Sequence, residues 1–476
     1  MFTMDEMGGP GRRGGPPGRM EGPGGRRASF DRDWTKGSIA GNIWGLAWPM
    51  TVSGLIQMLG PTIDMIWVGK LGAASIAGVG VAGTAVMLIN AARMGLNTGT
   101  RAMLARFVGA EDFEGANHIA QQALVISAVF AVVMAIVGIA FASPILRLLG
   151  VEADVVSEGT AYMRIVFAGS IFMSFGMMAQ GTMQAAGDAV NPMKITIGTR
   201  ILHTAICPFL IFGWSIFPRL GVSGAAATNI ASQGVGAVIM LWFLFSGRTR
   251  LKPTLKNFRF DGEIVWRIVK IGIPASITGL ERNLANFVLM WLVAPFGTLA
   301  VAAHSLVQRV DTFLHMPAMG VGQASGVLAG QNLGAGQPER AEKTGWLAAG
   351  MFSIIMLVGS LAIWFWAEYI VSIFNSQPDL VKIASTFLRI EIVSYAVFGL
   401  VMVLANCLNG VGDTWPPMIT TLVTLWGVQV PMAYFLPKVT NLGVYGVRWG
   451  IVSAIVIRAV IYSVYFKLGR WKRKQV

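Results

Sequence analysis

Long apolar segments recur along this chain from Ala40 to Phe466, and they constrain its fold more than any other feature. A helix that crosses about 30 Å of hydrocarbon needs about 20 mostly apolar residues. Only 13% of the 476 residues are charged, whereas soluble domains average roughly a quarter. We therefore predict an all-α membrane protein with twelve transmembrane helices. The predicted spans are 40–68, 75–99, 117–142, 158–183, 192–217, 221–247, 266–293, 300–325, 343–369, 383–409, 417–437 and 442–466.

An internal repeat divides these spans into two sets of six. The repeat keeps a constant offset of 225 residues over a long stretch without a gap. The matched positions include Pro49 and Pro274, Gly54 and Gly279, Met94-Gly95 and Met319-Gly320, Gly109-Ala110 and Gly334-Ala335, and Gly187-Asp188 and Gly412-Asp413. Because the offset covers an even number of spans, both copies enter the membrane in the same orientation. We predict two pseudo-symmetric six-helix bundles with a solute site between them near the midplane.

The predicted domains follow from this division. Residues 1–37 form a disordered cytoplasmic tail, 38–247 an N-lobe, 248–263 a cytoplasmic linker, 264–466 a C-lobe and 467–476 a basic cytoplasmic tail. The first tail is rich in Gly, Pro and Arg, and its arginines and acids nearly balance, which argues against a nucleic-acid arm.

Lysine and arginine concentrate in the loops after the even-numbered predicted spans. These residues are Arg101, Arg106, Arg248, Arg250, Lys252, Lys256, Arg259, Arg340, Lys343, Arg470, Lys472, Arg473 and Lys474. Because cytoplasmic loops retain positive charge, both termini are expected in the cytoplasm, in a multi-pass protein of the plasma (inner) membrane. The net charge of +14 then indicates contact with anionic lipid headgroups of the bilayer and not with nucleic acid.

Three segments carry a family resemblance. They are Pro49 through Asp64 to Val68-Gly69-Lys70-Leu71-Gly72, Val321 through Gly336, and Asn409-Gly410-Val411-Gly412-Asp413-Thr414 with Pro416-Pro417. Together they resemble the multidrug and toxic compound extrusion (MATE) family of cation-coupled antiporters, within the multidrug/oligosaccharidyl-lipid/polysaccharide exporter superfamily. The resemblance implies a V-shaped pair of bundles that exports amphipathic, usually cationic, small molecules in exchange for H⁺ or Na⁺. It implies no cofactor beyond the coupling ion.

Asp64 is the leading candidate for cation coupling. A bare carboxylate at membrane depth costs several kcal/mol, so an intramembrane acid is a functional candidate by default. Gly60 and Pro61 precede Asp64 by about one turn and weaken the helix there, so occupancy of Asp64 by a cation could bias a bend. The alternative is an aspartate at the outer end of the helix that reaches water.

Around Asp64 the sequence departs from the family. Relatives often carry an Asn and, one turn later, an Asp before Pro, whereas this chain has His203 and Cys207-Pro208. An imidazole and a thiol are poor Na⁺ ligands, and a histidine beside a buried aspartate suits proton coupling. His203 could instead be a packing residue. Thr228 and Asn229 lie where relatives often complete the cation site, or they serve as contacts between helices.

The second half offers candidates for the substrate cavity. Glu281 lies near a glutamate of many relatives, and Glu391 is a second intramembrane acid that could instead pair with Arg389. Met58, Met290 and Met316 are expected to line the cavity, since flexible thioethers accept many shapes. His118, His304 and His315 show no ligand spacing, so no metal site is predicted.

Two other functions compete with an antiporter. A lipid-linked saccharide flippase of the same superfamily should have a more cationic cavity and often extra helices. A membrane-embedded enzyme would need convergent nucleophile, base or metal groups, and no such cluster stands out in the sequence. We expect a monomeric transporter and not an enzyme.

Overall fold

The computed structural model describes residues 32–148, 150, 152–214, 217–254, 256 and 258–474, apart from the side chains of residues 85 and 88. Within these residues the secondary structure is helical, without strands. The first half contains α1 (Ile39–Val68), α2 (Ala73–Gly109), α3 (Phe113–Leu148), α4 (Ala153–Ala168), α5 (Ser170–Ala185), α6 (Val190–Phe212) and α7 (Val222–Phe245). The second half contains α8 (Gly262–Val293), α9 (Thr298–Gly334), α10 (Pro338–Phe374), α11 (Pro378–Gly410), α12 (Trp415–Leu422), α13 (Val430–Val439) and α14 (Tyr445–Leu468).

Two predicted spans are each built from more than one helix. The fourth consists of α4 and α5, which meet at Gly169 with a bend of 49°. The eleventh consists of α12 and α13, joined by a π-helical turn over Val423–Gln429. The prediction of twelve membrane helices is confirmed once these pieces are joined.

Three of the twelve spans are less apolar than the others. Among the described residues, eight helices, and nine if α4 and α5 count as one, are long and apolar enough to cross a membrane by composition. The other three are α1, α8 and α9, which carry Asp64, Glu281 and Asp311 well inside their length. Charged residues inside these helices lower their mean hydropathy, which is the quantity by which membrane spans are recognised in a sequence.

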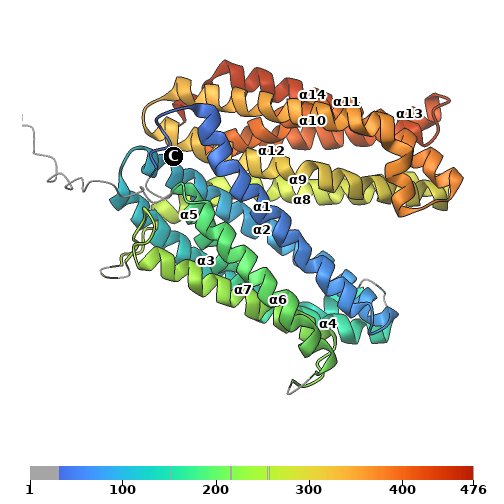
Figure 1. The fold of residues 1–476 in the computed structure, drawn as a ribbon, viewed down its shortest axis with the longest axis horizontal. Coiled ribbons are helices and arrows are strands. Elements are labelled where there is room, and N and C mark those ends of the chain that lie inside the picture. Colours follow the sequence, from blue (N-terminus) through green and yellow to red (C-terminus); the bar gives the residue numbers. More distant parts are fainter. Residues whose placement is uncertain are drawn as a thin grey trace, which may run out of the picture.

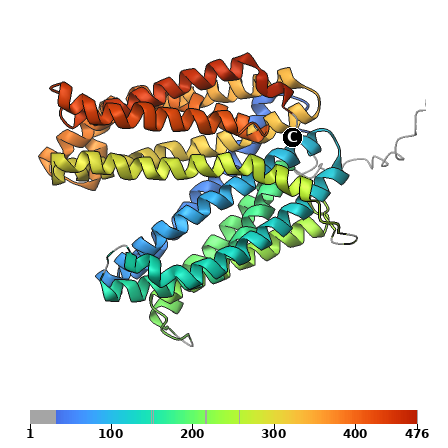
Figure 2. The same cartoon turned by 180° about the vertical axis from the view of Figure 1, so that it is seen from behind.

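The helices form two lobes that meet at one end and diverge toward the other (Figure 1). Helices α2 to α7 form one lobe and α8 to α14 the other, and the view from behind shows the same divergence (Figure 2). The lobes join where α2 packs against α8 and α9, and α1 against α9. Both ends of the described chain lie there, since Arg340 Nη2 donates to the Gly37 carbonyl at 2.8 Å and Arg106 Nη1 to the Lys474 carbonyl at 2.6 Å.

Glycines allow the lobes to approach closely at the joined end. A Cβ at Gly95 of α2 would lie 1.9 Å from Ser276 Oγ of α8. The repeat-matched Gly109 and Gly334 each press against a backbone carbonyl of the opposite lobe, at 2.0 Å from a hypothetical Cβ. No side chain larger than hydrogen fits where these helices cross. The repeated glycines therefore determine where the two bundles contact each other.

Helix α1 belongs to both lobes. Its first half, including Ile43 and Leu46, packs in the same hydrophobic core as α9 and α11 of the C-lobe. Its second half packs against α6 of the N-lobe. A change in the shape of α1 therefore acts on both bundles.

The predicted first tail, residues 1–37, lies mostly outside the described residues. Its last part is described and is packed, because Trp34 is 4% exposed and the Arg32 Nη2 donates to Asn42 Oδ1 at 2.6 Å. The predicted linker lies along the N-lobe, where Gln122 Nε2 donates to the Arg259 carbonyl at 2.6 Å.

Candidate functional site

Asp64 lies in the second half of α1 and points into the N-lobe. Its side chain is buried, at 2% exposure, so it does not reach water in this conformation. His203 Nε2 lies 3.0 Å from Asp64 Oδ1, and Asn229 Nδ2 donates to Oδ2 at 3.3 Å. The Cys207 thiol donates to Oδ1 at 3.6 Å. Three helices thus bring together three residues predicted for this site, and Cys207 with them.

Helical spacing explains why these side chains converge. His203 and Cys207 are four residues apart on α6, so both lie on the face turned toward α1. On α7, Gln233 Nε2 donates to Asn229 Oδ1 at 2.5 Å, which orients the amide so that its nitrogen faces Asp64. Thr228, the other residue predicted on α7, is turned away, because its hydroxyl donates to the Gly224 carbonyl at 2.7 Å.

Arg200 contacts the ring nitrogen of His203 that faces away from Asp64. Arg200, one turn earlier on α6, places Nη1 3.4 Å from His203 Nδ1. A guanidinium is a donor only, so a hydrogen bond in this contact requires Nδ1 to accept. The other ring nitrogen, Nε2, lies 3.0 Å from Asp64 Oδ1 but has no hydrogen-bond partner of good geometry among the described residues. His203 therefore lies between a cation and a carboxylate.

The same cluster bears on metal binding. The ligand atoms of Asp64, His203 and Cys207 lie within 4.8 Å of one another, close enough to surround an ion. A metal would need the lone pair of His203 Nε2, and the Arg200 cation lies behind the ring. A hard cation prefers several converging oxygens, whereas this cluster offers one carboxylate, an imidazole and a thiol.

Comparison with known proteins gives the family. The MatE family model matches residues 49–209 and 274–435, one stretch in each half of the chain. The chain belongs to the MatE family. Two similar proteins are the probable multidrug resistance protein YoeA of Bacillus subtilis, 26% identical over 90% of this chain and 93% of that protein, and the multidrug resistance protein NorM of Burkholderia vietnamiensis, 28% identical over 89% and 92%.

The fold of this MATE protein matches solved structures as well. A crystal structure of MATE in the bent conformation superposes with a TM-score of 0.86 at 26% identity, and covers 91% of this chain and 96% of that one. The chain is accordingly a multi-pass membrane transporter of the MATE multidrug efflux family and not an enzyme.

The two acids predicted for the substrate cavity of this MATE protein are buried in the C-lobe. Glu281 on α8 is 6% exposed, and neither carboxylate oxygen has a hydrogen-bond partner among the described residues. Glu391 on α11 pairs with Arg448 of α14. The expected pairing of Glu391 with Arg389 is wrong, since Arg389 Nη2 lies 3.1 Å from Glu368 Oε1 on α10. Arg389 is two residues before Glu391, about 200° around α11, so the two side chains point in nearly opposite directions.

Helical spacing relates the three methionines to residues at contacts between α1, α2, α8 and α9. Met58 is two turns after Thr51, which touches Gly320 of α9, and it is 44% exposed. Met316 is one turn before Gly320 and is 8% exposed. Met290 lies four turns after Ser276, whose hydroxyl donates to the Ala92 carbonyl of α2 at 3.3 Å. Their positions suit a cavity between the lobes, which stays a prediction.

A second buried cluster was missed by the sequence reasoning. Asp311 of α9 accepts a hydrogen bond from the Tyr395 hydroxyl, which also lies 3.0 Å from Glu391 Oε2. Arg448 pairs with Glu391 and donates to the His304 carbonyl at 3.3 Å. Two acids face one guanidinium here. An Asp in the middle of a predicted span was a visible signal for this cluster.

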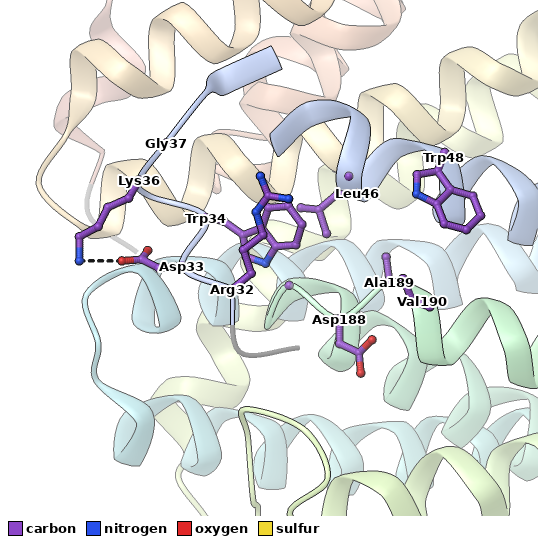
Figure 3. A pocket seen from close by; sticks show the side chains of 12 residues that line it. Arg32, Asp33, Trp34, Lys36, Gly37, Leu46, Trp48, Asp188, Ala189 and Val190 are labelled. Atoms are coloured by element: carbon purple, nitrogen blue, oxygen red, sulfur yellow. Dashed lines mark ion pairs between the residues drawn. The ribbon is translucent and has the colours of Figure 1, made fainter. Parts of the chain in front are cut away.

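A cavity of about 640 Å³ lies at the joined end of the lobes. Its lining includes Trp34 from the segment before α1, Trp48 from α1, and Asp188 from the turn before α6 (Figure 3). Asp33 and Lys36 form an ion pair of 2.8 Å at its edge. Asp64 lies about 24 Å along α1 from Trp48, at 1.5 Å per residue, so this cavity is separate from the Asp64 site.

Proposed function

We propose that this MATE protein is a secondary antiporter that exports amphipathic, cationic compounds in exchange for H⁺ by alternating access. The observation that carries the proposal is the Asp64–His203 contact of 3.0 Å inside the N-lobe, where both side chains are buried. A buried carboxylate in this setting can take up one more proton, and its charge then vanishes from the interior of the lobe. Na⁺ would find one carboxylate and a side-chain amide, which is a poor set of ligands.

The orientation in the membrane follows from the distribution of charge. Arg106, Arg340 and Lys474 lie where the lobes join and contact the chain ends there. Positive charge favours the cytoplasmic side, so the joined end with both termini faces the cytoplasm of the plasma membrane and the lobes diverge outward. Each chain contains both lobes and a complete Asp64 site, which supports a monomeric transporter.

Two observations support the substrate class. Two relatives bear names of multidrug resistance proteins. The three methionines of α1, α8 and α9 provide an apolar, deformable lining. No observation favours a saccharide flippase.

The test is transport into everted membrane vesicles. With ΔpH imposed in Na⁺-free buffer, the wild type should accumulate a lipophilic cation such as ethidium, and Asp64→Asn should abolish accumulation because the amide cannot exchange a proton. Asp154→Asn, an exposed acid in the first turn of α4, is the control and should transport normally. Wild-type accumulation by Asp64→Asn would contradict the proposal.

A further inference from the structure

Arg93 of α2 is a buried arginine inside a membrane-spanning helix, and no carboxylate pairs with it among the described residues. The residue is 7% exposed. Its Nε donates to Ser174 Oγ of α5 at 3.1 Å, and its Nη1 donates to Asn90 Oδ1 at 2.7 Å. Both partners are neutral, and no group of the described chain accepts from Nη2. Because a charged side chain at membrane depth is costly, Arg93 is a candidate functional residue.

The internal repeat indicates that the packing of α2 does not require an arginine at this position. At the offset of 225 residues, Arg93 corresponds to Ala318 of α9, and Ser174 corresponds to Gly399 of α11. Ala318 is fully buried, and α9 packs against α11 as α2 packs against α5. The C-lobe therefore fills the equivalent place with a methyl group. The fold that the two lobes share does not explain Arg93.

Positive charge exceeds negative charge inside the N-lobe. Arg200 of α6 also faces inward, since its Nη2 donates to the Gln57 carbonyl of α1 at 3.3 Å and its Nη1 lies 3.4 Å from His203 Nδ1. Helices α1, α2, α5, α6 and α7 together carry a single acid, Asp64. Within the described chain this carboxylate contacts His203 and forms an ion pair with neither arginine. Two guanidinium groups thus share one carboxylate, and one of them is left without a balancing charge.

The interior beside Arg93 is polar, and helix packing does not close it between α1 and α2. These two helices make few contacts with each other, whereas α1 packs against α6 and α2 against α4 and α5. Gln57 of α1 is exposed, and its Nε2 donates to Gln180 Oε1 of α5 at 3.2 Å. Met94, the residue after Arg93, is 45% exposed. An amphipathic compound that passes between α1 and α2 therefore meets amides, a thioether and a guanidinium.

We propose that Arg93 binds a carboxylate group of the transported compound, so that the substrates include amphipathic zwitterions. The inference rests on the proposed function and deepens it, because it adds one negative group to the cationic compounds proposed above. A guanidinium donates to a carboxylate through planar N–H groups, in charge-assisted hydrogen bonds that are stronger than those between neutral groups. Ser174 and Asn90 orient the guanidinium before the ligand arrives, which lowers the entropic cost of binding.

The charge balance of the N-lobe favours a single carboxylate. When a carboxylate binds at Arg93, the two guanidinium groups of the lobe are matched by two carboxylates. A compound that carries positive charge alone leaves Arg93 unbalanced. The pyrophosphate of a lipid-linked saccharide carries more negative charge than an excess of one guanidinium can balance.

Two dyes that differ in one group test the proposal. Rhodamine B is a zwitterion with a free carboxylate, and its methyl ester is a cation with the same ring system. Binding is measured by fluorescence anisotropy with the purified full-length protein in nanodiscs, and empty nanodiscs correct for partition into lipid. The wild type should bind both dyes. Arg93→Met should weaken binding of rhodamine B by about tenfold or more and that of the ester by less than about twofold, because it removes a hydrogen bond to a charged group.

Arg147→Met is the control, because Arg147 is an exposed arginine of the same lobe in the last turn of α3. This variant should bind both dyes as the wild type does. Failure of the wild type to bind rhodamine B, unchanged binding of rhodamine B by Arg93→Met, or an equal loss for both dyes would each overturn the proposal. If the methionine variant does not fold, Arg93→Gln replaces it with the same expected results, since its amide can still donate to Ser174 or Asn90.

The dye comparison is separate from the test of the proposed function. Binding is measured without a proton gradient, so it does not depend on whether Asp64 exchanges a proton. Wild-type transport by Asp64→Asn would contradict proton coupling and leave the role of Arg93 unaffected. An equal loss of binding for both dyes in Arg93→Met would contradict the role of Arg93 and leave proton coupling unaffected.

Discussion

His203 Nε2 lies 3.0 Å from Asp64 Oδ1, in a part of the N-lobe that is closed to water. The family resemblance implies oxygen-bearing side chains at the positions of His203 and Cys207. The imidazole and the thiol found there are the basis of the proposed preference for a proton over Na⁺.

Restoring oxygen ligands should change the coupling ion. His203→Asn with Cys207→Asp gives Asp64 a second carboxylate and an amide oxygen, which are ligands that a hard cation prefers. We expect transport by the double variant to become stimulated by an inward Na⁺ gradient at constant pH, measured as ethidium efflux from proteoliposomes. The single variant Cys207→Ser, which keeps a small donor beside Asp64, is the control and should stay insensitive to Na⁺. If ethidium efflux by the double variant did not respond to the Na⁺ gradient, the identity of these two ligands would not determine the coupling ion.

Gly60→Ala should impair transport, because its new Cβ must displace Arg200. Overpacking of this kind costs about 1 to 3 kcal/mol, seen as a lower midpoint of thermal unfolding in detergent. Gly54→Ala is the control on the same helix, since a Cβ there has no neighbour within 4 Å. Equal behaviour of the two variants in both assays would contradict the packing of Arg200 on Gly60.

We expect the Glu391–Arg448 pair in the C-lobe to contribute mainly to the stability of the folded protein. Removing one member of a buried pair leaves an uncompensated charge and costs about 3 to 5 kcal/mol. Arg448→Met should therefore lower the unfolding midpoint strongly, and Glu391→Gln added to it should recover part of the loss. Arg389→Met breaks the more exposed pair with Glu368, which is worth about 0 to 1 kcal/mol. If Arg389→Met lowered the unfolding midpoint more than Arg448→Met, the predicted difference between the exposed and the buried pair would be wrong.

Much of the architecture was predictable from the sequence. Apolar length gave the twelve spans, and matched glycines such as Gly109 and Gly334 lie where the lobes touch. The proximity of Asp64, His203 and Asn229 followed from the family resemblance. The bend at Gly169 could not be predicted, because no proline or charge stands beside it. The π-helical turn after α12 does have a signal in the sequence, since Pro431 lies two residues beyond it and cannot donate to a carbonyl within the turn.

The burial of individual charges was the least predictable feature. The repeat matches Asp64 with Leu289 and Asp311 with Val86, so the two lobes share their packing but not their charged positions. Which face of a span points inward depends on the rotation of the helix, which apolar composition does not fix. For this reason the burial of Glu281 and Glu391 and the contact of Arg200 with the Gln57 carbonyl could not be read from spacing, and the cavity role of the two acids stays a prediction.

Proton exchange at Asp64 is most directly tested by measuring the proton itself. Purified protein in lightly buffered, Na⁺-free detergent solution is mixed with ethidium, and a pH indicator records whether protons leave the protein on substrate binding. The account predicts release by the wild type and by Asp154→Asn, and none by Asp64→Asn at saturating ethidium. Equal proton release by Asp64→Asn and the wild type would contradict it.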